Sequence, residues 1–377
     1  MELLAGSGAF IIGIVVPFLF VLTIVVFFHE LGHFAVARWC GVGVKAFSVG
    51  FGPELFGWTD RCGTRWKFCA IPLGGYVKFE GDENVASVPD QQSLKSMTGD
   101  ARARAFHLKP VWQRAAVVVA GPLANFILAI VIFGAIFFTL GERVTVPRVD
   151  EVQPGSAAAE AGLLPGDIIV SIEGEAIESF AGIQRIVTFS AERPLDFTID
   201  RDNELIDVII TPQRREMDDG FGNIQRIGVI GIVHAPSETD TRVIEYGPIG
   251  ATVRAAEQTG TVITQSLTYI GRILVGQEPP DQLSGPVRVA KLSGDVATLG
   301  ILPLLQLAAI ISVSIGLVNL FPIPMLDGGH LMFYAIEALR GRPLSERSQE
   351  LGFRFGLAMV MGLMVFATWN DIVNLMR

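Results

Sequence analysis

The stretch VVFFHELGHFAVARW, residues 25–39, decides the fold because it joins an uncharged apolar run to three ionisable side chains. Residues 3–28 carry no charge, and about 20 apolar residues are enough to cross the hydrocarbon core of a bilayer. His29, Glu30 and His33 follow at the end of this run. Ionisable side chains are costly at such a position and are retained there for function. The stretch therefore predicts a membrane-spanning helix that ends in a functional site.

Three more segments are apolar enough to span a membrane. Residues 115–141 and 296–326 are uncharged, and a fourth segment carries only Arg354, near its start, where the side chain can snorkel to the interface. Half of the 377 residues are hydrophobic, only 18% are charged and the mean hydropathy is +0.47, which is too apolar for an ordinary soluble globule. We therefore expect a polytopic α-helical membrane protein with four transmembrane helices, at about residues 8–36, 112–140, 298–322 and 351–370.

The distribution of Lys and Arg predicts the orientation of these spans. Eleven lie from Arg38 to Arg114 and four more from Arg340 to Arg354, whereas none precedes the first span. The positive-inside rule places these two segments in the cytoplasm and both termini outside. The net charge of −9 argues against a nucleic-acid partner held through its phosphates. Three cysteines without Cys-x-x-Cys spacing indicate neither a disulfide framework nor a zinc ribbon.

The ionisable residues at the end of the first span have the spacing of a zinc hydrolase. In a helix, His29 and His33 lie one turn apart on the same face, so both imidazoles can reach one metal ion. Glu30 can take a proton from a water whose pKa zinc lowers to about 7, and deliver it to the leaving amine. The alternative is a pair of helix-end histidines satisfied by interfacial water. A haem or metal-transport site would explain the histidines but would leave Glu30 without a role.

A third metal ligand is expected from another span at a similar depth. The stretch NLFPIPMLDGGH, residues 319–330, offers Asp327 at the end of the third uncharged run. The first and third spans both run inward, so both end on the cytoplasmic side. An unpaired carboxylate there costs about 2.5–3.5 kcal/mol, which coordination of a cation offsets. Two alternatives remain open: Asp327 caps the following helix, or His330 supplies the ligand instead.

The same stretch contains Asn319 and two prolines, Pro322 and Pro324. Prolines free backbone carbonyls, which a membrane tolerates only where they are buried against protein or line a wet cavity. A hydrolase needs such a cavity to bring water to a peptide bond in lipid, and Asn319 could then hydrogen-bond an unwound substrate backbone. A simple kink satisfied by neighbouring helices explains the prolines equally well.

Together these stretches resemble the site-2 protease family of intramembrane zinc metalloproteases, and most closely its bacterial RseP-type branch. The resemblance covers essentially the whole chain and also rests on FSVGFGPELF, IPLGGYVKFEG, AGPLANFILA and LSGPVRVAK. It implies one zinc ion held by His29, His33 and Asp327, with Glu30 as the catalytic base. It also implies cleavage of a single-span membrane protein within or near its transmembrane helix.

Between the first two spans, residues 43–80 contain short apolar and aromatic segments interrupted by glycines. This pattern predicts hairpin strands. Their edge could pair with an extended substrate by strand addition. The resemblance implies a membrane-associated sheet with this role, to which Gly74 and Gly75 of PLGGYV belong. The alternative is a plain structural hairpin. In the second span, Gly121, Pro122 and Asn125 are expected to serve helix packing.

The chain therefore divides into four predicted parts. The order of strands, turns and a short Ala-rich helix in residues 141–235 resembles a single extracytoplasmic PDZ domain of α+β fold, inserted between the second and third spans. Such a domain could occlude the active-site entrance or dock a trimmed substrate. Residues 236–295 are expected to form an interfacial amphipathic connector, because charges interrupt their apolar face. Residues 1–140 and 296–377 form the two halves of the membrane core.

The predicted function is regulated intramembrane proteolysis in a bacterial inner membrane, with the active site toward the cytoplasm. The expected partners are the lipid bilayer and single-span membrane proteins that another protease has already cleaved, such as an anti-sigma factor or signal-peptide remnants. Two alternatives are kept. A catalytically silent PDZ adaptor would not need Glu30, and a metal transporter would need polar residues in the second and fourth spans, which have almost none.

Overall fold

The computed structural model describes residues 11–82, 97, 99–218, 224–234, 240–276 and 285–375. The chain forms two compact units, one made of Met1–Ala135 with Gly250–Arg377 and the other of Ile136–Ile249. Pieces of all four predicted parts lie outside the described residues: 1–10, 83–96 and 98 of the first half of the membrane core, 219–223 and 235 of the PDZ-like part, 236–239 and 277–284 of the connector, and the last two residues.

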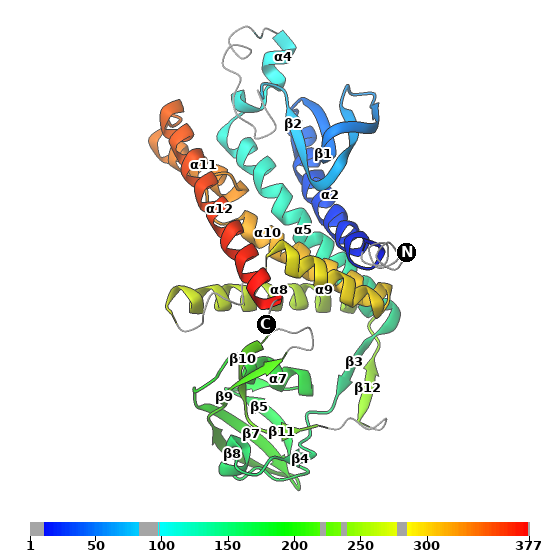
Figure 1. Ribbon diagram of the computed structural model, residues 1–377, viewed down its shortest axis with the longest axis vertical. Helices are drawn as coiled ribbons and strands as arrows, with labels where there is room; N and C mark the ends of the chain where they lie inside the picture. Colours follow the sequence, from blue (N-terminus) through cyan, green and yellow to red (C-terminus); the bar gives the residue numbers. More distant parts are fainter. Residues whose placement is uncertain are drawn as a thin grey trace. The chain divides into compact units, whose positions relative to one another are not determined.

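Helices dominate the first unit (Figure 1). Those that belong to it or enter it are η1 (Ile11–Val15), α2 (Val16–Trp39), α4 (Gly99–Arg104), η2 (Phe106–Leu108), α5 (Val111–Leu140), α8 (Pro248–Leu274), α9 (Pro286–Thr298), α10 (Ile301–Asn319), α11 (Asp327–Arg340) and α12 (Glu346–Leu375). In the described part of the chain, four segments are long and apolar enough to cross a membrane: Ile12–Trp39, Val111–Leu140, Ile301–Asn319 and Arg347–Val373. The prediction of four spans is confirmed, and the chain is a multi-pass membrane protein.

The third span is shorter than the predicted range of 298–322. It begins after Gly300, whose φ of +115° ends the preceding helix α9 in a conformation that favours glycine. It ends at Asn319 because Pro322 and Pro324, which lack a backbone N–H, cannot continue a helix. The backbone then passes through Met325, a non-glycine residue with a φ of +90°, before α11 begins at Asp327.

A curled sheet of β1 (Val44–Thr59) and β2 (Arg65–Phe79) follows α2 and confirms the predicted strands. The first half of β1 is paired on both sides by β2, with residues 75–79 on one side and 65–68 on the other. Phe47 is fully buried in this sheet, with its ring 4.4 Å from that of Trp66 and 5.6 Å from that of Phe34 on α2. Among the described strands, residues 75–79 pair on one side only, so they form an edge of the sheet.

Helix α8 lies within residues 236–295, the predicted connector, and helix α9 begins within it and ends at Thr298. The N-terminus of α9 is held by Asp371 of α12, whose carboxylate accepts the backbone N–H groups of Gly285 and Arg288, each at 2.9 Å. On α8, Ala251 and Ala255 are buried, and a Cβ added at Gly134 of α5 would lie 3.7 Å from the Cβ of Ala255. Small residues here allow the helices to approach closely.

The second unit is rich in strands and contains two short helices. Its elements are β3 (Glu142–Thr145), β4 (Glu151–Val152), α6 (Ala157–Glu160), β5 (Ile168–Ile172), β6 (Glu175–Ala176), α7 (Phe180–Thr188), β7 (Leu195–Arg201), β8 (Glu204–Ile210), β9 (Gln213–Asp218), β10 (Ile224–Val229), β11 (Ile232–Val233) and β12 (Thr241–Ile244). The main sheet is antiparallel in the order β6-β5-β7-β8, and three further strand pairs, β3 with β12, β4 with β11 and β9 with β10, complete the unit.

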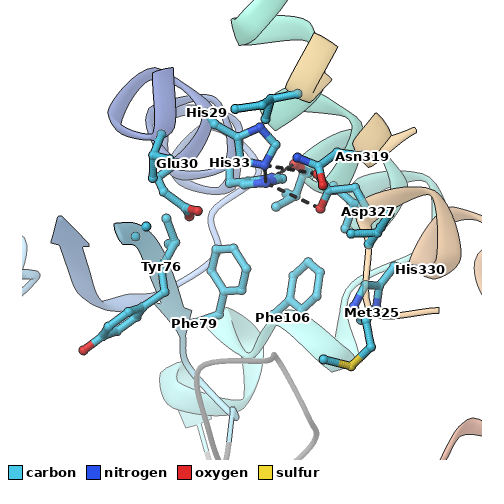
Figure 2. A pocket seen from close by; sticks show the side chains of 18 of the residues that line it. His29, Glu30, His33, Tyr76, Phe79, Phe106, Asn319, Met325, Asp327 and His330 are labelled. Carbon is cyan, nitrogen blue, oxygen red and sulfur yellow. Dashed lines mark hydrogen bonds and ion pairs between the residues drawn. The ribbon is translucent and has the colours of Figure 1, made fainter. Parts of the chain in front are cut away.

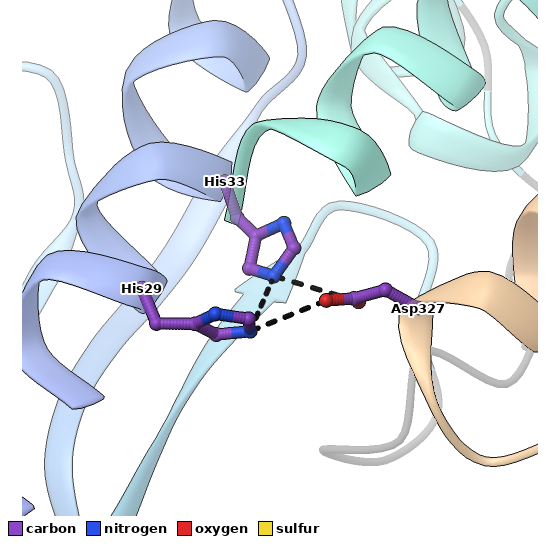
Figure 3. Close-up of side chains that lie close together, drawn as sticks. All are labelled: His29, His33 and Asp327. Carbon is purple, nitrogen blue, oxygen red and sulfur yellow. Dashed lines mark hydrogen bonds and ion pairs between the residues drawn. The ribbon is translucent and has the colours of Figure 1, made fainter. Parts of the chain in front are cut away.

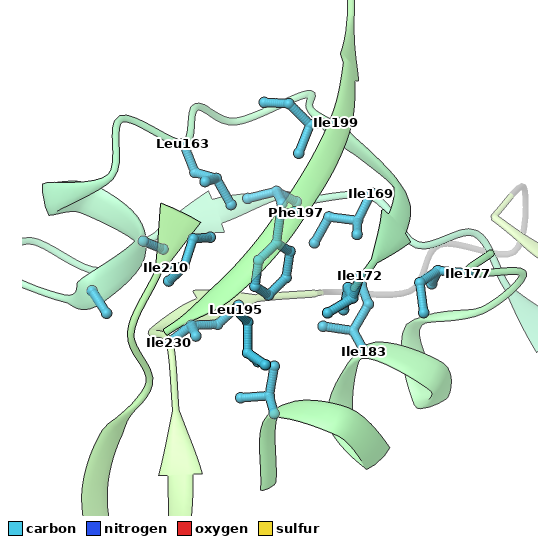
Figure 4. Packing of buried hydrophobic residues seen from close by; sticks show 14 residues of the cluster. Leu163, Ile169, Ile172, Ile177, Ile183, Leu195, Phe197, Ile199, Ile210 and Ile230 are labelled. Atoms are coloured by element: carbon cyan, nitrogen blue, oxygen red, sulfur yellow. The ribbon is translucent and has the colours of Figure 1, made fainter. Parts of the chain in front are cut away.

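The core of the second unit lies between its main sheet and α7 (Figure 4). Alternate residues of β7 point inward, so Leu195, Phe197 and Ile199 are at most 1% exposed. Helix α7 contributes Ile183 and Val187, which lie four residues apart on one face. This unit therefore has its own hydrophobic core.

Candidate active site

Helix α2 carries the two histidines that the sequence predicts as metal ligands. Their spacing of four residues places both rings on one helix face, with ring centroids 4.8 Å apart and Nε2 atoms 3.2 Å apart. The Nδ1 atom of His33 lies 2.9 Å from the carbonyl oxygen of Val117 on α5. Because a carbonyl only accepts, Nδ1 of His33 donates, and Nε2 of the neutral ring is left with a lone pair.

Asp327 closes the group from the other side (Figure 3). Its Oδ2 atom lies 3.2 Å from Nε2 of His29, and its Oδ1 atom lies 3.6 Å from Nε2 of His33. One ligand atom from each of the three residues lies within 4.8 Å of the others. The residue at the N-cap of α11 is Leu326, and Asp327 is the first helical residue. The alternative interpretation of Asp327 as the helix cap is therefore wrong.

The three residues fit a catalytic zinc ion. Two imidazole nitrogens and a carboxylate are the donor set of several catalytic zinc sites, which use three protein ligands. Within the described part of the chain, Oδ2 of Asp327 is a buried oxygen without a hydrogen-bond partner. A cation shared by this carboxylate and the two imidazole nitrogens would compensate the buried charge.

Close approach of α2 and α5 brings these groups together. Gly32, between the two histidines, packs against α5, where a Cβ would overlap the carbonyl oxygen of Ala120 and lie 2.7 Å from the Cβ of Ala124. Gly121 leaves room for His33, whose imidazole ring a Cβ would overlap. The expected packing role of Gly121 thus serves the site itself.

All the other predicted site residues line one cavity of about 580 Å³ (Figure 2). Glu30 projects into it from α2, and Val77 of β2 lines the same cavity. Gly74 and Gly75 border the cavity at the sheet edge, and a Cβ at Gly75 would lie 3.1 Å from Cγ of Glu30. Asn319, the last residue of α10, lies on the opposite wall. The structure therefore brings together every residue that the sequence analysis selected.

The rest of the cavity wall is largely apolar. Val26, Leu73 and Ile315 are among its lining residues. His330 also lines it but is not part of the group of three converging ligand atoms. Its ring lies 5.3 Å from that of Phe353, and burial lowers the pKa of His330, so the ring is neutral near pH 7.

One polar residue beside the histidines was not expected to take part. Asn125 of α5, predicted to serve packing, has its side-chain nitrogen 3.3 Å from Nδ1 of His29. A buried amide in an uncharged span was the available signal, because such a group needs a polar partner. The sequence does not show that the partner is a histidine on another helix.

Comparison with known proteins gives the family. A family model described as peptidase family M50 matches residues 17–363. A protein of Agrobacterium fabrum named "Putative zinc metalloprotease Atu1380" is 51% identical over 375 residues, which cover 100% of both chains. A Rhizobium meliloti protein, "Putative zinc metalloprotease R01501", is 52% identical over 94% of this chain and 95% of its own. "Metalloprotease MmpA" of Caulobacter vibrioides is 42% identical over 95% of this chain and 94% of its own.

The class of protein is thus a membrane-embedded metalloprotease, a hydrolase of peptide bonds. The chain belongs to peptidase family M50, the site-2 protease family, which confirms the family predicted from the sequence. The names of its relatives imply Zn²⁺ as the cofactor, also as predicted.

Proposed function

We propose that the chain is a zinc-dependent intramembrane endopeptidase, which cleaves single-span membrane proteins within or near their transmembrane helix. One observation carries this proposal. His29 and His33 lie within the first candidate span, Asp327 begins the helix that follows the third span, and their ligand atoms share a largely apolar cavity with Glu30. A soluble protease would not need its catalytic residues between apolar helices.

His29, His33 and Asp327 would hold the zinc ion. When bound, zinc supplies Lewis acidity, which makes water nucleophilic near neutral pH and polarises a carbonyl group. The hydrogen bond from His33 to the carbonyl oxygen of Val117 fixes the orientation of that ring. The carboxylate of Asp327 is fixed by its place in the first turn of α11.

Glu30 would be the catalytic base. Its carboxylate lines the cavity beside the ligands. It would take the proton of the attacking water and later give that proton to the leaving amine. No other Asp or Glu among the described residues lines the cavity, apart from the ligand Asp327.

The sheet edge would bind the substrate in an extended form. A helical peptide bond is shielded by its own hydrogen bonds, so the substrate must unwind before it is cut. Residues 75–79 form a sheet edge next to Glu30, which suits strand addition, and Asn319 could bind the substrate backbone from the opposite wall. A membrane-associated position of this sheet is supported by Leu55 and Phe56, which are 74% and 65% exposed.

We place the protein in a bacterial inner membrane, with both termini and the second unit outside and the active site toward the cytoplasm. The Lys and Arg distribution supports this orientation. The second unit would be a PDZ-like domain that gates access or docks substrates already cut by another protease. Its antiparallel sheet, short helices and independent core are compatible with such a domain.

The test is cleavage of a model single-span protein by the purified enzyme in detergent. We expect Glu30→Gln to lose cleavage while it still binds about one zinc per chain, because Glu30 is not a ligand. Glu350→Gln, the same change at an exposed glutamate outside the cavity, serves as the control and should cleave like the wild type. Equal cleavage by Glu30→Gln and the wild type would refute the proposal.

A further inference from the structure

Asn125 occupies an unusual position for a polar residue. It lies in the middle of the second span, its side chain is fully buried, and its amide faces Nδ1 of His29 at 3.3 Å. In the described part of the chain, its Oδ1 atom has no hydrogen-bond partner. A buried amide oxygen without a hydrogen-bond partner costs free energy, so a donor for this oxygen is expected nearby.

The chemistry of a metal-bound imidazole supplies such a donor, the Nδ1 hydrogen of His29. Nε2 is the atom of His29 that faces Asp327 and His33, so Nε2 must carry the lone pair for the metal. A neutral imidazole has a single N–H, which must then be on Nδ1. An amide NH₂ group cannot accept this hydrogen, whereas an amide oxygen can. A half-turn about the Cβ–Cγ bond of Asn125 exchanges the two atoms without a change of shape.

His33 already shows the same arrangement. Its Nδ1 donates to the backbone oxygen of Val117 at 2.9 Å, and Val117 lies eight residues before Asn125 on the same helix α5. Eight residues are about two helical turns. Helices α2 and α5 run in opposite directions through the membrane, so the earlier residue of α5 meets the later histidine. One face of α5 therefore offers an acceptor to each histidine.

Asn125 is held rigidly enough to orient a ligand. The hydroxyl of Ser312 on α10 donates to its backbone oxygen at 2.9 Å. On the same helix, a Cβ at Gly316 would lie only 3.2 Å from the Cβ of Asn125. Asn125 is thus clamped between the helix of His29 and α10, the span that leads to Asp327.

We propose that Asn125 is a positioning residue for the metal site, and that its side-chain oxygen accepts the Nδ1 hydrogen of His29 and fixes the tautomer and orientation of that ring. This inference rests on the metal site of the proposed function. Partners of this kind typically change metal affinity 10–100-fold when they are removed.

The first test measures zinc affinity by competition with a chelator, using the full-length protein in detergent. Asn125→Leu, of similar size but without an acceptor, should bind zinc about 10–100-fold more weakly. Asn125→Asp keeps an acceptor and should stay within about tenfold of the wild type. Ser314→Ala is the matched control and should bind zinc like the wild type, because the hydroxyl of Ser314 on α10 donates to the carbonyl of Ile310 on its own helix and lies outside the cavity.

The second test reads the hydrogen bond itself. The chain has five histidines, so ¹⁵N-histidine labelling gives few signals, and His29→Gln identifies the signal of His29. In the zinc-loaded wild type, the Nδ1 hydrogen of His29 should be shifted downfield and exchange slowly. It should exchange rapidly in Asn125→Leu and remain protected in Asn125→Asp.

Two results would overturn the inference: equal zinc affinity of Asn125→Leu and the wild type, or equal weakening in the Leu and Asp variants with an unchanged His29 signal. A wild type that binds no zinc would instead refute the proposed metal site.

Discussion

The close contact of α2 and α5 gives a sharp prediction for Gly32→Ala. This substitution changes no ligand and no residue of the cavity wall. The new Cβ would overlap the carbonyl oxygen of Ala120 and lie 2.7 Å from the Cβ of Ala124. The carbonyl oxygen of Ala120 is a backbone atom and the Cβ of Ala124 is fixed to the backbone, so neither can rotate away from the new methyl group. The two helices must therefore move apart.

The size of the effect follows from ordinary contact distances. Carbon atoms pack at about 3.5–4.0 Å, so α5 must withdraw by about 1 Å. The hydrogen bond of 2.9 Å between Nδ1 of His33 and Val117 then lengthens to about 3.9 Å, beyond hydrogen-bonding range. Loss of such a partner weakens metal binding about 10–100-fold, or about 1.4–2.7 kcal/mol. Overpacking of this kind also costs about 1–3 kcal/mol of stability.

The assay is chelator competition for zinc, combined with thermal unfolding of the same samples. Gly134→Ala is the matched control, because it makes the same change in α5 where a Cβ would meet Ala255 at an ordinary 3.7 Å. We expect weak zinc binding and a lower melting temperature for Gly32→Ala, and neither for Gly134→Ala. If Gly32→Ala binds zinc as tightly as Gly134→Ala, the close approach of the helices does not support the site.

Three further predictions concern the two units. Burial would raise the pKa of Asp167, but its hydrogen bonds, chiefly from Arg201, outweigh burial and hold the pKa below its usual value. The charge of Asp167 therefore stabilises the second unit above the unfolded pKa of about 3.9, and this stabilisation is lost as the pH falls through the pKa of the folded state. The hydrogen-exchange protection of β7 should differ between the wild type and Asp167→Asn at pH 7. The two should converge at low pH. Phe197→Ala should destabilise the second unit by about 3–5 kcal/mol, seen as faster hydrogen exchange in β5 and β7, with zinc affinity unchanged. Arg114→Met should cost at most about 3–5 kcal/mol because it leaves the partly buried carboxylate of Glu337 unpaired. Adding Glu337→Met should restore most of this loss in thermal unfolding, and additive losses in the double variant would contradict the argument.

Much of the membrane unit could be predicted because its signals are local. Long uncharged runs determine the spans, and helical periodicity alone places His29 and His33 on one face. The matching depth of the first and third spans predicts Asp327 as the third ligand, but not the conformation of the loop that precedes it. The positive φ of Met325 is imposed by the surrounding structure, since no L-residue prefers it.

The remaining features depend on contacts between residues far apart in the sequence. The start of helix α9 is fixed by Asp371, more than 80 residues later. The pairing of β1 with β2 on both sides cannot be deduced from strand propensity, because both partner segments have similar sequences of apolar and aromatic residues. The partner of Asn125 becomes visible only when α2 and α5 are placed side by side.

The central claim is that His29, His33 and Asp327 hold a zinc ion. Zinc K-edge X-ray absorption of the purified full-length protein tests this most directly. We predict only nitrogen and oxygen ligands at about 2.0–2.2 Å, with two imidazoles in the first shell, and loss of stoichiometric zinc in Asp327→Ala. A sulfur ligand at about 2.3 Å, or full zinc occupancy in Asp327→Ala, would contradict the account.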